Sequence, residues 1–230
     1  MNTTRNLTKR STLFRYAFLL VFCAGVVGMS APQATAALVL PPGASPTAVP
    51  VTAPPILAGA LATAVTPFAS VPGGVSFTGS LTSEVFADDG TNPFAGGLIF
   101  TYIVTSTGGS DAITGFRVNG YAGWLVEVAQ AVIGGTDAPT SGASRSSGSG
   151  DTIRFDFFST PELKLNSSNE LIVYTNAVSW MNTTFTAQDG ASTGGVGPAL
   201  SPAPEPASVI AWGLMGLIGL GYAWRRRSVA

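Results

Sequence analysis

The feature that most constrains the fold is a series of seven or eight short segments between residues 74 and 189 in which apolar and polar residues alternate. In DTIRFDFFS, for example, Ile153, Phe155 and Phe157 share one face of an extended chain. Turn signals rich in glycine and serine separate the segments. This spacing predicts a mainly β protein with a single antiparallel β-sandwich of jelly-roll or Ig-like type at residues 73–190. Nine aromatic residues form its predicted core: Phe77, Phe86, Phe100, Tyr102, Phe116, Phe155, Phe157, Tyr174 and Phe185.

The charged residues are few and unevenly distributed. They make up only 10% of the chain, and basic residues crowd its two ends. Between residues 84 and 205, four basic residues stand against all twelve acidic ones. Because an acidic surface repels phosphate backbones, we expect no nucleic-acid partner.

The first 36 residues have the organisation of a secretory signal peptide. Basic residues up to Arg15 precede an apolar run at residues 16–29, and Ala34 and Ala36 supply the small residues at which signal peptidase cuts. We therefore expect export and cleavage after Ala36, and the alternative is an uncleaved anchor helix. Cys23, the single cysteine, lies in the apolar run, so the mature chain is predicted to have no disulfide.

Two proline-rich segments flank the predicted sandwich. Residues 37–72 contain repeated prolines, which interrupt helices and central strands, so this segment is predicted to be mostly an extended linker. Within it, residues 56–65 are compatible with a short strand or a small helix. Residues 191–206 are predicted to be a second linker, rich in glycine and proline.

The end of the chain has the pattern of a membrane-spanning segment. Residues 207–224 contain no charged residue, and this length is just sufficient for a helix that crosses a bilayer. Arg225, Arg226 and Arg227 follow, and the positive-inside rule places residues 225–230 in the cytoplasm as a basic tail. The body of the protein then lies outside the inner membrane. A plain membrane anchor is the first alternative, and a buried core helix is disfavoured by the terminal arginines.

The residues around this span carry a family resemblance. Pro204-Glu205-Pro206, then Ala207-Ser208, a short glycine-containing span and Arg225–Arg227 together resemble the PEP-CTERM sorting signal of Gram-negative bacteria that make exopolysaccharide. The resemblance implies processing near the Pro-Glu-Pro triplet by exosortase, an integral-membrane cysteine peptidase. It also implies that Glu205 is a recognition element and that the three arginines are a retention signal. The mature protein would join the cell surface or a biofilm matrix.

The residue types present argue against several classes of enzyme. The chain has no histidine, which excludes serine–histidine triads and histidine metal sites, and the mature chain has no thiol for catalysis. We therefore expect a non-catalytic protein without a cofactor. A secreted glycoside hydrolase remains an alternative, because that chemistry needs only two carboxylates in a cleft.

Two groups of residues are candidate ligand contacts. Asp88, Asp89 and Asn92 in ADDGTNP offer the oxygen ligands that Ca²⁺ prefers, but these residue types are also typical of a turn, which is the favoured interpretation. Trp124 and Trp180 are candidates for stacking on sugar rings. Core packing is the favoured alternative for both, because apolar residues flank them.

These patterns favour an exported structural or interaction protein whose partners are signal peptidase, exosortase and exopolysaccharide. In this hypothesis the acidic body meets anionic polysaccharide through bridging Ca²⁺. A secreted carbohydrate-binding module is the first alternative, and a simple membrane-anchored surface protein is the second.

Overall fold

The computed structural model describes residues 37–52, 59–70, 77–133, 137–158, 162–189 and 194–204, together with Leu217. The predicted signal peptide with Ala34 and Ala36 lies outside the described residues, and so do residues 205–208 and Arg225–Arg227. The predicted membrane span also lies outside them, apart from Leu217. No helix in the described part of the chain is long and apolar enough to cross a bilayer.

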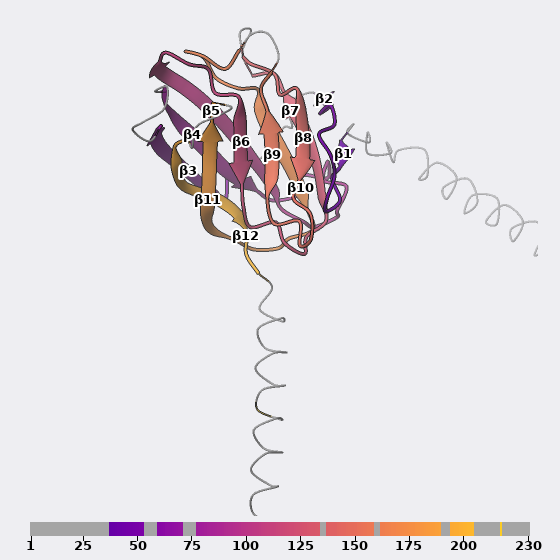
Figure 1. Cartoon of the computed structure of the whole chain (residues 1–230). Coiled ribbons are helices and arrows are strands. Elements are labelled where there is room, and N and C mark those ends of the chain that lie inside the picture. The colour runs from indigo at the N-terminus through magenta and orange to yellow at the C-terminus, as the bar shows by residue number, and fades with distance from the viewer. Residues whose placement is uncertain are drawn as a thin grey trace, which may run out of the picture. The chain divides into compact units, whose positions relative to one another are not determined.

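Two sheets make up the described body, and the mainly β prediction is confirmed (Figure 1). Sheet A contains β1 (Leu38–Val39), β2 (Val51–Thr52), β3 (Ala62–Ala69), β4 (Phe77–Phe86), β5 (Ile99–Gly109), β7 (Val126–Ala131) and β10 (Glu170–Thr175). Sheet B contains β6 (Gly115–Val118), β8 (Gly142–Arg145), β9 (Ile153–Asp156), β11 (Trp180–Gln188) and β12 (Val196–Pro202).

Both sheets are built from antiparallel pairs, except that β2 runs parallel to β7. The strand order in sheet A is β1-β7-β10-β5-β4-β3, and β2 lies against β7 as well. The order in sheet B is β12-β11-β6-β9-β8. The register of β4 on β5 places Leu81 opposite Val104 and Val85 opposite Phe100, so the apolar side chains of both strands share one face.

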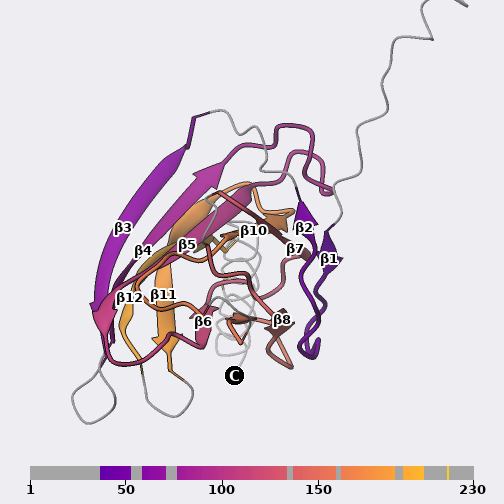
Figure 2. The same ribbon diagram turned by 90° about the horizontal axis from the view of Figure 1, so that it is seen from above.

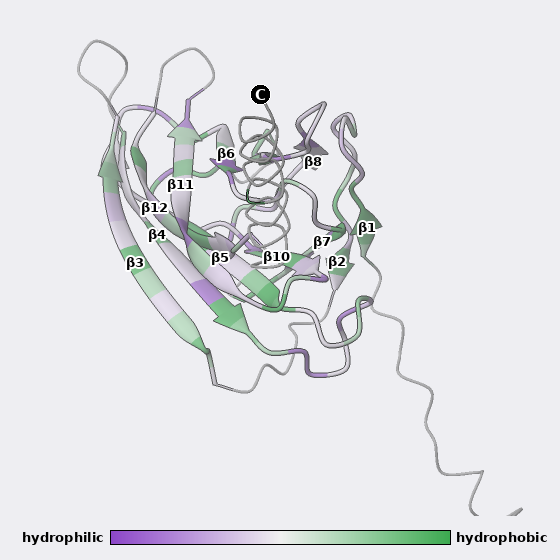
Figure 3. Ribbon diagram, turned by 90° about the horizontal axis from the view of Figure 1, so that it is seen from below, coloured by the Kyte–Doolittle hydropathy of each residue, from purple (hydrophilic) through white to green (hydrophobic). Residues whose placement is uncertain are grey.

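One hydrophobic core lies between the two sheets. Period-two alternation places Phe77, Leu81 and Val85 of β4 on the inner face, and all three side chains are fully buried. Figure 3 shows hydrophobic bands along β3 as well, but this strand does not follow the strict alternation, since its Val65 is 64% exposed. Rings from the two sheets meet directly, since the ring centroids of Tyr102 in β5 and Phe116 in β6 lie 5.6 Å apart.

All nine predicted core aromatics are buried, but two of them belong to a second, smaller cluster. Phe86 and Tyr174 lie on the outer face of sheet A with Ile172, and Phe94 from the loop after β4 packs against them. The middle strands of sheet A are therefore apolar on both faces, which explains their nearly continuous apolar sequences.

The predicted linker at residues 37–72 differs from the structure, because its first part closes one side of the body. We call residues 38–52 the strap. β1 pairs with β7 in sheet A, Thr47 exchanges two backbone hydrogen bonds with Ala143 of β8 in sheet B, and β2 returns to β7. Figure 2 shows β1 and β2 at the side of the body where β7 and β8 also lie. Leu40 and Val49 of the strap are buried in the main core.

Strands also extend beyond both ends of the predicted 73–190 domain. β3 lies within the predicted linker 37–72, and β12 takes up much of the predicted linker 191–206. Both are edge strands, where Pro67 and Pro198 are tolerated because one side of the strand forms no ladder. The two edges meet, since the Thr66 hydroxyl donates a hydrogen bond to the Pro198 carbonyl at 2.8 Å. The folded body thus continues to the start of the Pro-Glu-Pro triplet.

Candidate functional site

The last strand of the described residues ends close to the first proline of the predicted sorting motif. Pro202, the last residue of β12, is buried and pairs with Trp180 of β11. The Ala203 N–H donates a hydrogen bond to the Ser179 carbonyl at 3.0 Å, and Pro204 is exposed. The last strand and the Pro-Glu-Pro triplet are therefore contiguous, with a single residue between them.

Exposed apolar side chains gather at this exit. Leu125, Val178, Trp180 and Met181, which we call the apolar rim, are between 39 and 69% exposed. Their loops are joined, because the Leu125 N–H donates a hydrogen bond to Asn176 Oδ1 at 2.9 Å. Apolar side chains that gather on a surface mark a contact with lipid or with another protein.

The two candidate tryptophans have different environments at this end of the body. Trp124 is only 8% exposed and belongs to the main core, as the favoured interpretation predicts. Trp180 is 39% exposed, so the core interpretation is wrong for this residue. Trp124, but not Trp180, lines a hollow of about 470 Å³, together with described residues that include Asn176, Met181 and Pro204.

The Ca²⁺ candidates form a hydrogen-bonded turn. The Asp88 carboxylate accepts a hydrogen bond from the Gly90 N–H at 2.8 Å, and the Asp89 carboxylate accepts one from the Thr91 N–H at 2.9 Å. Asn92 is buried, and its side-chain amide donates to a carbonyl of β10 at 3.1 Å. These contacts fit the turn interpretation. Among the described residues, no group of three or more acidic, histidine or cysteine side chains is arranged to hold a metal ion.

The outer face of sheet B carries a row of polar residues across four strands. The register aligns Ser144 of β8, Arg154 of β9, Arg117 of β6 and Thr186 of β11. Arg117 and Arg154, which we call the arginine pair, therefore occupy directly opposite positions. Like charges at such positions repel each other and destabilise the pairing of the two strands.

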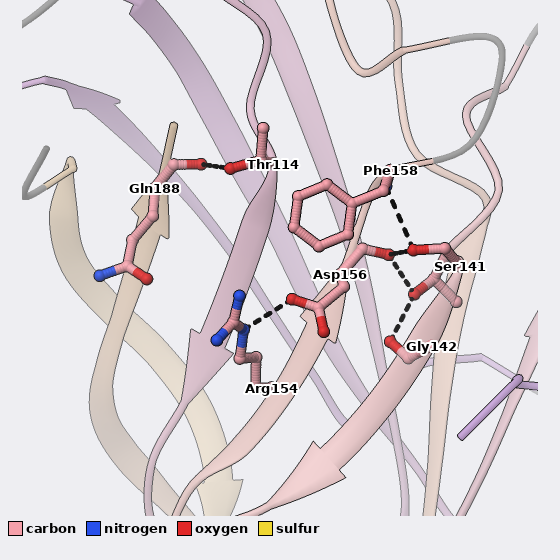
Figure 4. Close-up of polar contacts among 8 residues, drawn as sticks. Thr114, Ser141, Gly142, Arg154, Asp156, Phe158 and Gln188 are labelled. Carbon is pink, nitrogen blue, oxygen red and sulfur yellow. Dashed lines mark hydrogen bonds and ion pairs between the residues drawn. The ribbon is translucent and has the colours of Figure 1, made fainter. Parts of the chain in front are cut away.

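One arginine of the pair has a carboxylate neighbour. Arg154 Nε lies 2.6 Å from Asp156 Oδ1, and Figure 4 shows the two side chains turned toward each other. Asp156 is held in place by Thr140 and Ser141, whose hydroxyl groups donate hydrogen bonds to its backbone carbonyl at 2.8 and 3.0 Å. The Arg117 guanidinium has no hydrogen bond or ion pair with any described residue. This surface therefore keeps one uncompensated positive charge.

A second hollow of about 470 Å³ opens between the arginine pair and the strap. Hydroxyl groups line it beside the two guanidinium groups, and the residues that contribute are Ser144, Ser146, Ser147, Thr152, Arg117 and Arg154. No carboxylate lines this hollow. The chemistry of the lining suits an anionic group, because guanidinium and hydroxyl groups both donate hydrogen bonds to carboxylate oxygens.

A third arginine near this hollow is structural. Arg145 of β8 is 4% exposed, and its guanidinium donates hydrogen bonds to four backbone carbonyls at 2.6 to 3.0 Å, those of Leu40, Tyr121, Trp124 and Gly150. Burial lowers the pKa of the Arg145 guanidinium, but an arginine remains protonated in proteins. The Arg145 guanidinium is therefore occupied within the fold, where its hydrogen bonds connect the strap to neighbouring loops.

The outer face of sheet A carries the opposite charge. We call Glu84, Asp89, Glu127 and Glu170 the acidic face. Asp89, Glu127 and Glu170 lie near Tyr174, and Glu84 lies near Glu170. Burial, followed by the negative charges of Asp89, Glu170 and Glu127, raises the pKa of Tyr174 to about 12. Burial and the Glu84 carboxylate raise the pKa of Glu170, and burial raises that of Glu127. Within the described residues, none of these four carboxylates forms an ion pair with a cation.

Neither a protein-family model, nor a curated protein, nor a solved structure matches this chain.

The structure brings together one group that the sequence pattern did not identify, the arginine pair. It also distinguishes the two candidate tryptophans, because Trp124 is buried and Trp180 is exposed.

Proposed function

We propose that this protein is an exported, non-catalytic component of the cell surface or extracellular matrix, sorted by its Pro-Glu-Pro tail. Signal peptidase removes residues 1–36, residues 207–224 hold the chain in the inner membrane, and an exosortase cuts near Pro204–Pro206. One observation carries the proposal: β12, the last strand among the described residues, ends at Pro202, two residues before the first proline of the triplet. Cleavage in this triplet therefore releases a complete body and leaves only the tail behind.

The apolar rim supports this arrangement. Three residue steps separate Pro204 from the start of the proposed span at residue 207, and an extended chain covers at most about 3.6 Å per residue. The exit end of the body then stays within about 11 Å of the bilayer before cleavage. Trp180 belongs to a residue type that favours membrane interfaces, so the rim rests against the headgroup region.

We further propose that the body is a β-sandwich of jelly-roll or Ig-like type, preceded by a signal helix and followed by a membrane helix. The two antiparallel sheets with a common core support the sandwich. The hydropathy of the two terminal segments supports the helices.

Intact mass spectrometry of the protein from membrane and extracellular fractions of its native host tests the sorting. We expect an extracellular form that starts near Ala37 and ends near Pro206. Glu205→Gln should accumulate in the membrane, whereas Glu162→Gln, which changes an exposed glutamate of the body, should be processed normally. A wild-type protein found only in the membrane with Arg225–Arg227 attached would contradict the proposal and indicate a simple anchor.

Carbohydrate binding is a second candidate function, and the 39% exposure of the Trp180 side chain favours it. An indole face can stack on a sugar ring. Titration of the protein with purified exopolysaccharide should then show saturable binding that Trp180→Ala abolishes. Val178→Ala, a matched change on the same rim, should bind as the wild type does. Equal binding by all three proteins would exclude this role of Trp180.

A further inference from the structure

We infer that the arginine pair on sheet B of one molecule binds the acidic face on sheet A of a second molecule, so that the bodies stack head to tail. This inference does not depend on the proposed sorting. The two patches belong to the same chain, and each carries charge that no described residue of the chain balances.

Charge complementarity is the first argument for this contact. The arginine pair has one carboxylate neighbour, Asp156, and therefore a surplus of positive charge. The acidic face has four carboxylates and no cation paired with them in the described part of the chain. Each patch contains like charges held close together by strand register, which costs free energy in the isolated molecule. A contact between the two patches removes both repulsions.

The hydrogen-bonding groups of the two patches are also complementary. The hollow beside Arg117 presents the hydroxyl groups of Ser144 and Ser147 next to the guanidinium groups. Glutamate side chains offer only acceptor oxygens when ionised. Burial is the main cause of the raised pKa values of Glu127 and Glu170, so additional donors from a second molecule would favour their ionised forms.

The positions of the two patches decide the form of the assembly. Sheets A and B share one core, so their outer faces point in opposite directions. A contact between the A face of one molecule and the B face of the next is heterologous, and it leaves one free patch at each end. Such a contact extends into open chains. The net acidic charge of the body opposes close approach at long range, but at about 0.1 M salt interactions beyond about 10 Å are largely screened.

A charge-swap experiment tests the inference with the full chain in neutral detergent. Sedimentation velocity at about 0.1 M salt measures self-association of the wild type, of Arg117→Glu, and of a Glu84→Arg/Glu127→Arg double variant. Because like charges then face each other, each variant alone should associate at least about tenfold more weakly than the wild type. An equimolar mixture of the two variants should regain association, since each reversed patch meets a patch of opposite charge.

Two further variants control for net charge and for contacts made by the tail. Lys164→Glu and Glu162→Arg change exposed charges outside both patches, and both proteins should associate as the wild type does. The tail is identical in every variant, so its contribution cancels in the comparison. Thermal melting checks that each variant is folded.

A second measurement avoids charge reversal. In a Cys23→Ser background, Ser144→Cys lies on the outer face of sheet B and Thr82→Cys on that of sheet A. A bismaleimide should link a Ser144→Cys chain to a Thr82→Cys chain more efficiently than it links either variant to itself.

Three results would overturn the inference: a wild-type protein that does not self-associate through its body, an Arg117→Glu variant that associates normally, or a mixture that remains dissociated. If the wild type stays monomeric but binds a polyuronate through Arg117, the arginine pair serves an acidic polysaccharide instead.

Discussion

The phenol oxygens of Tyr102 and Tyr121 lie 2.6 Å apart in the centre of the core. Tyr102 comes from β5 of sheet A, whereas Tyr121 follows β6 of sheet B, so this hydrogen bond connects the two sheets. The Tyr102 hydroxyl donates to the Leu200 carbonyl of β12 at 2.6 Å, which leaves Tyr121 as the donor to Tyr102. Both rings are fully buried, and burial raises the pKa of each phenol well above its ordinary value.

These tyrosines predict a loss of stability at alkaline pH. In the folded protein both phenols stay protonated above pH 10, whereas in the unfolded chain they ionise near pH 10. The unfolded state therefore binds fewer protons there, and the free energy of unfolding should fall as the pH rises above about 10. Urea unfolding between pH 8 and about 11 measures this slope. Tyr121→Phe should flatten it, and a wild-type slope of zero would contradict the prediction.

The strap should contribute to stability as core does, although its proline content is that of a linker. Leu40→Ala removes a side chain that is 1% exposed and should lower the free energy of unfolding by about 2–4 kcal/mol. Val39→Ala, a change at the neighbouring exposed position, should cost less than about 0.5 kcal/mol. Denaturant unfolding compares the two variants. Equal small effects would show that the strap does not stabilise the body.

Arg145 should be far more sensitive to substitution than the arginine pair. Arg145→Met leaves four buried carbonyls without their donor and should destabilise the protein by about 3 kcal/mol or more. Arg117→Met removes a guanidinium with no partner among the described residues, so we expect a change within about 0.5 kcal/mol. Thermal and urea unfolding of both variants measure the two losses in the free energy of unfolding. Losses of similar size would contradict the prediction.

Calcium should have no effect on the loop that contains Asp88. The carboxylates of Asp88 and Asp89 accept hydrogen bonds within the turn, and no third acidic side chain among the described residues joins them to hold an ion. We expect the melting temperature to be the same with about 1 mM Ca²⁺ and with a chelator. Calorimetry that detected a rise abolished by Asp89→Ala would instead establish a site.

The short distance between the body and the sorting motif should limit processing. Because Pro202 is buried and the triplet begins at Pro204, a peptidase that binds extended chain must work against the surface of the body. Insertion of Gly-Ser-Gly-Ser after Ala203 should therefore speed cleavage, which pulse-chase labelling in the native host measures. The same insertion in the loop at residues 146–150 provides the control and should leave the rate unchanged.

Alternation within single segments accounts for the part of the fold that could be predicted from the sequence. In β4 and β9, inward residues such as Leu81 and Phe155 are apolar and their neighbours are polar, so each strand is visible on its own. The strap and β12 are not visible in this way. Their prolines interrupt the alternation, although β12 pairs with β11, the strand directly before it. The strap in addition pairs with β7, a strand far away in the sequence.

The candidate site could be predicted only in part, for related reasons. Arg117 and Arg154 are unremarkable in sequence, and only the register of β6 on β9 brings them together. The exposure of Trp180 was missed because its apolar neighbours, Val178 and Met181, are themselves exposed. Apolar flanking residues indicate burial only where the segment as a whole faces the core.

The position of β12 at the very end of the body determines when the protein can finish folding. This strand completes its edge of sheet B and supplies the Leu200 carbonyl to the buried tyrosines. If the chain is exported as we propose, with its N-terminus first, these residues cross the membrane just before the proposed span at residues 207–224. The sandwich can then be completed only after β12 has crossed the membrane. A fully folded body therefore indicates that the tail has already reached the bilayer.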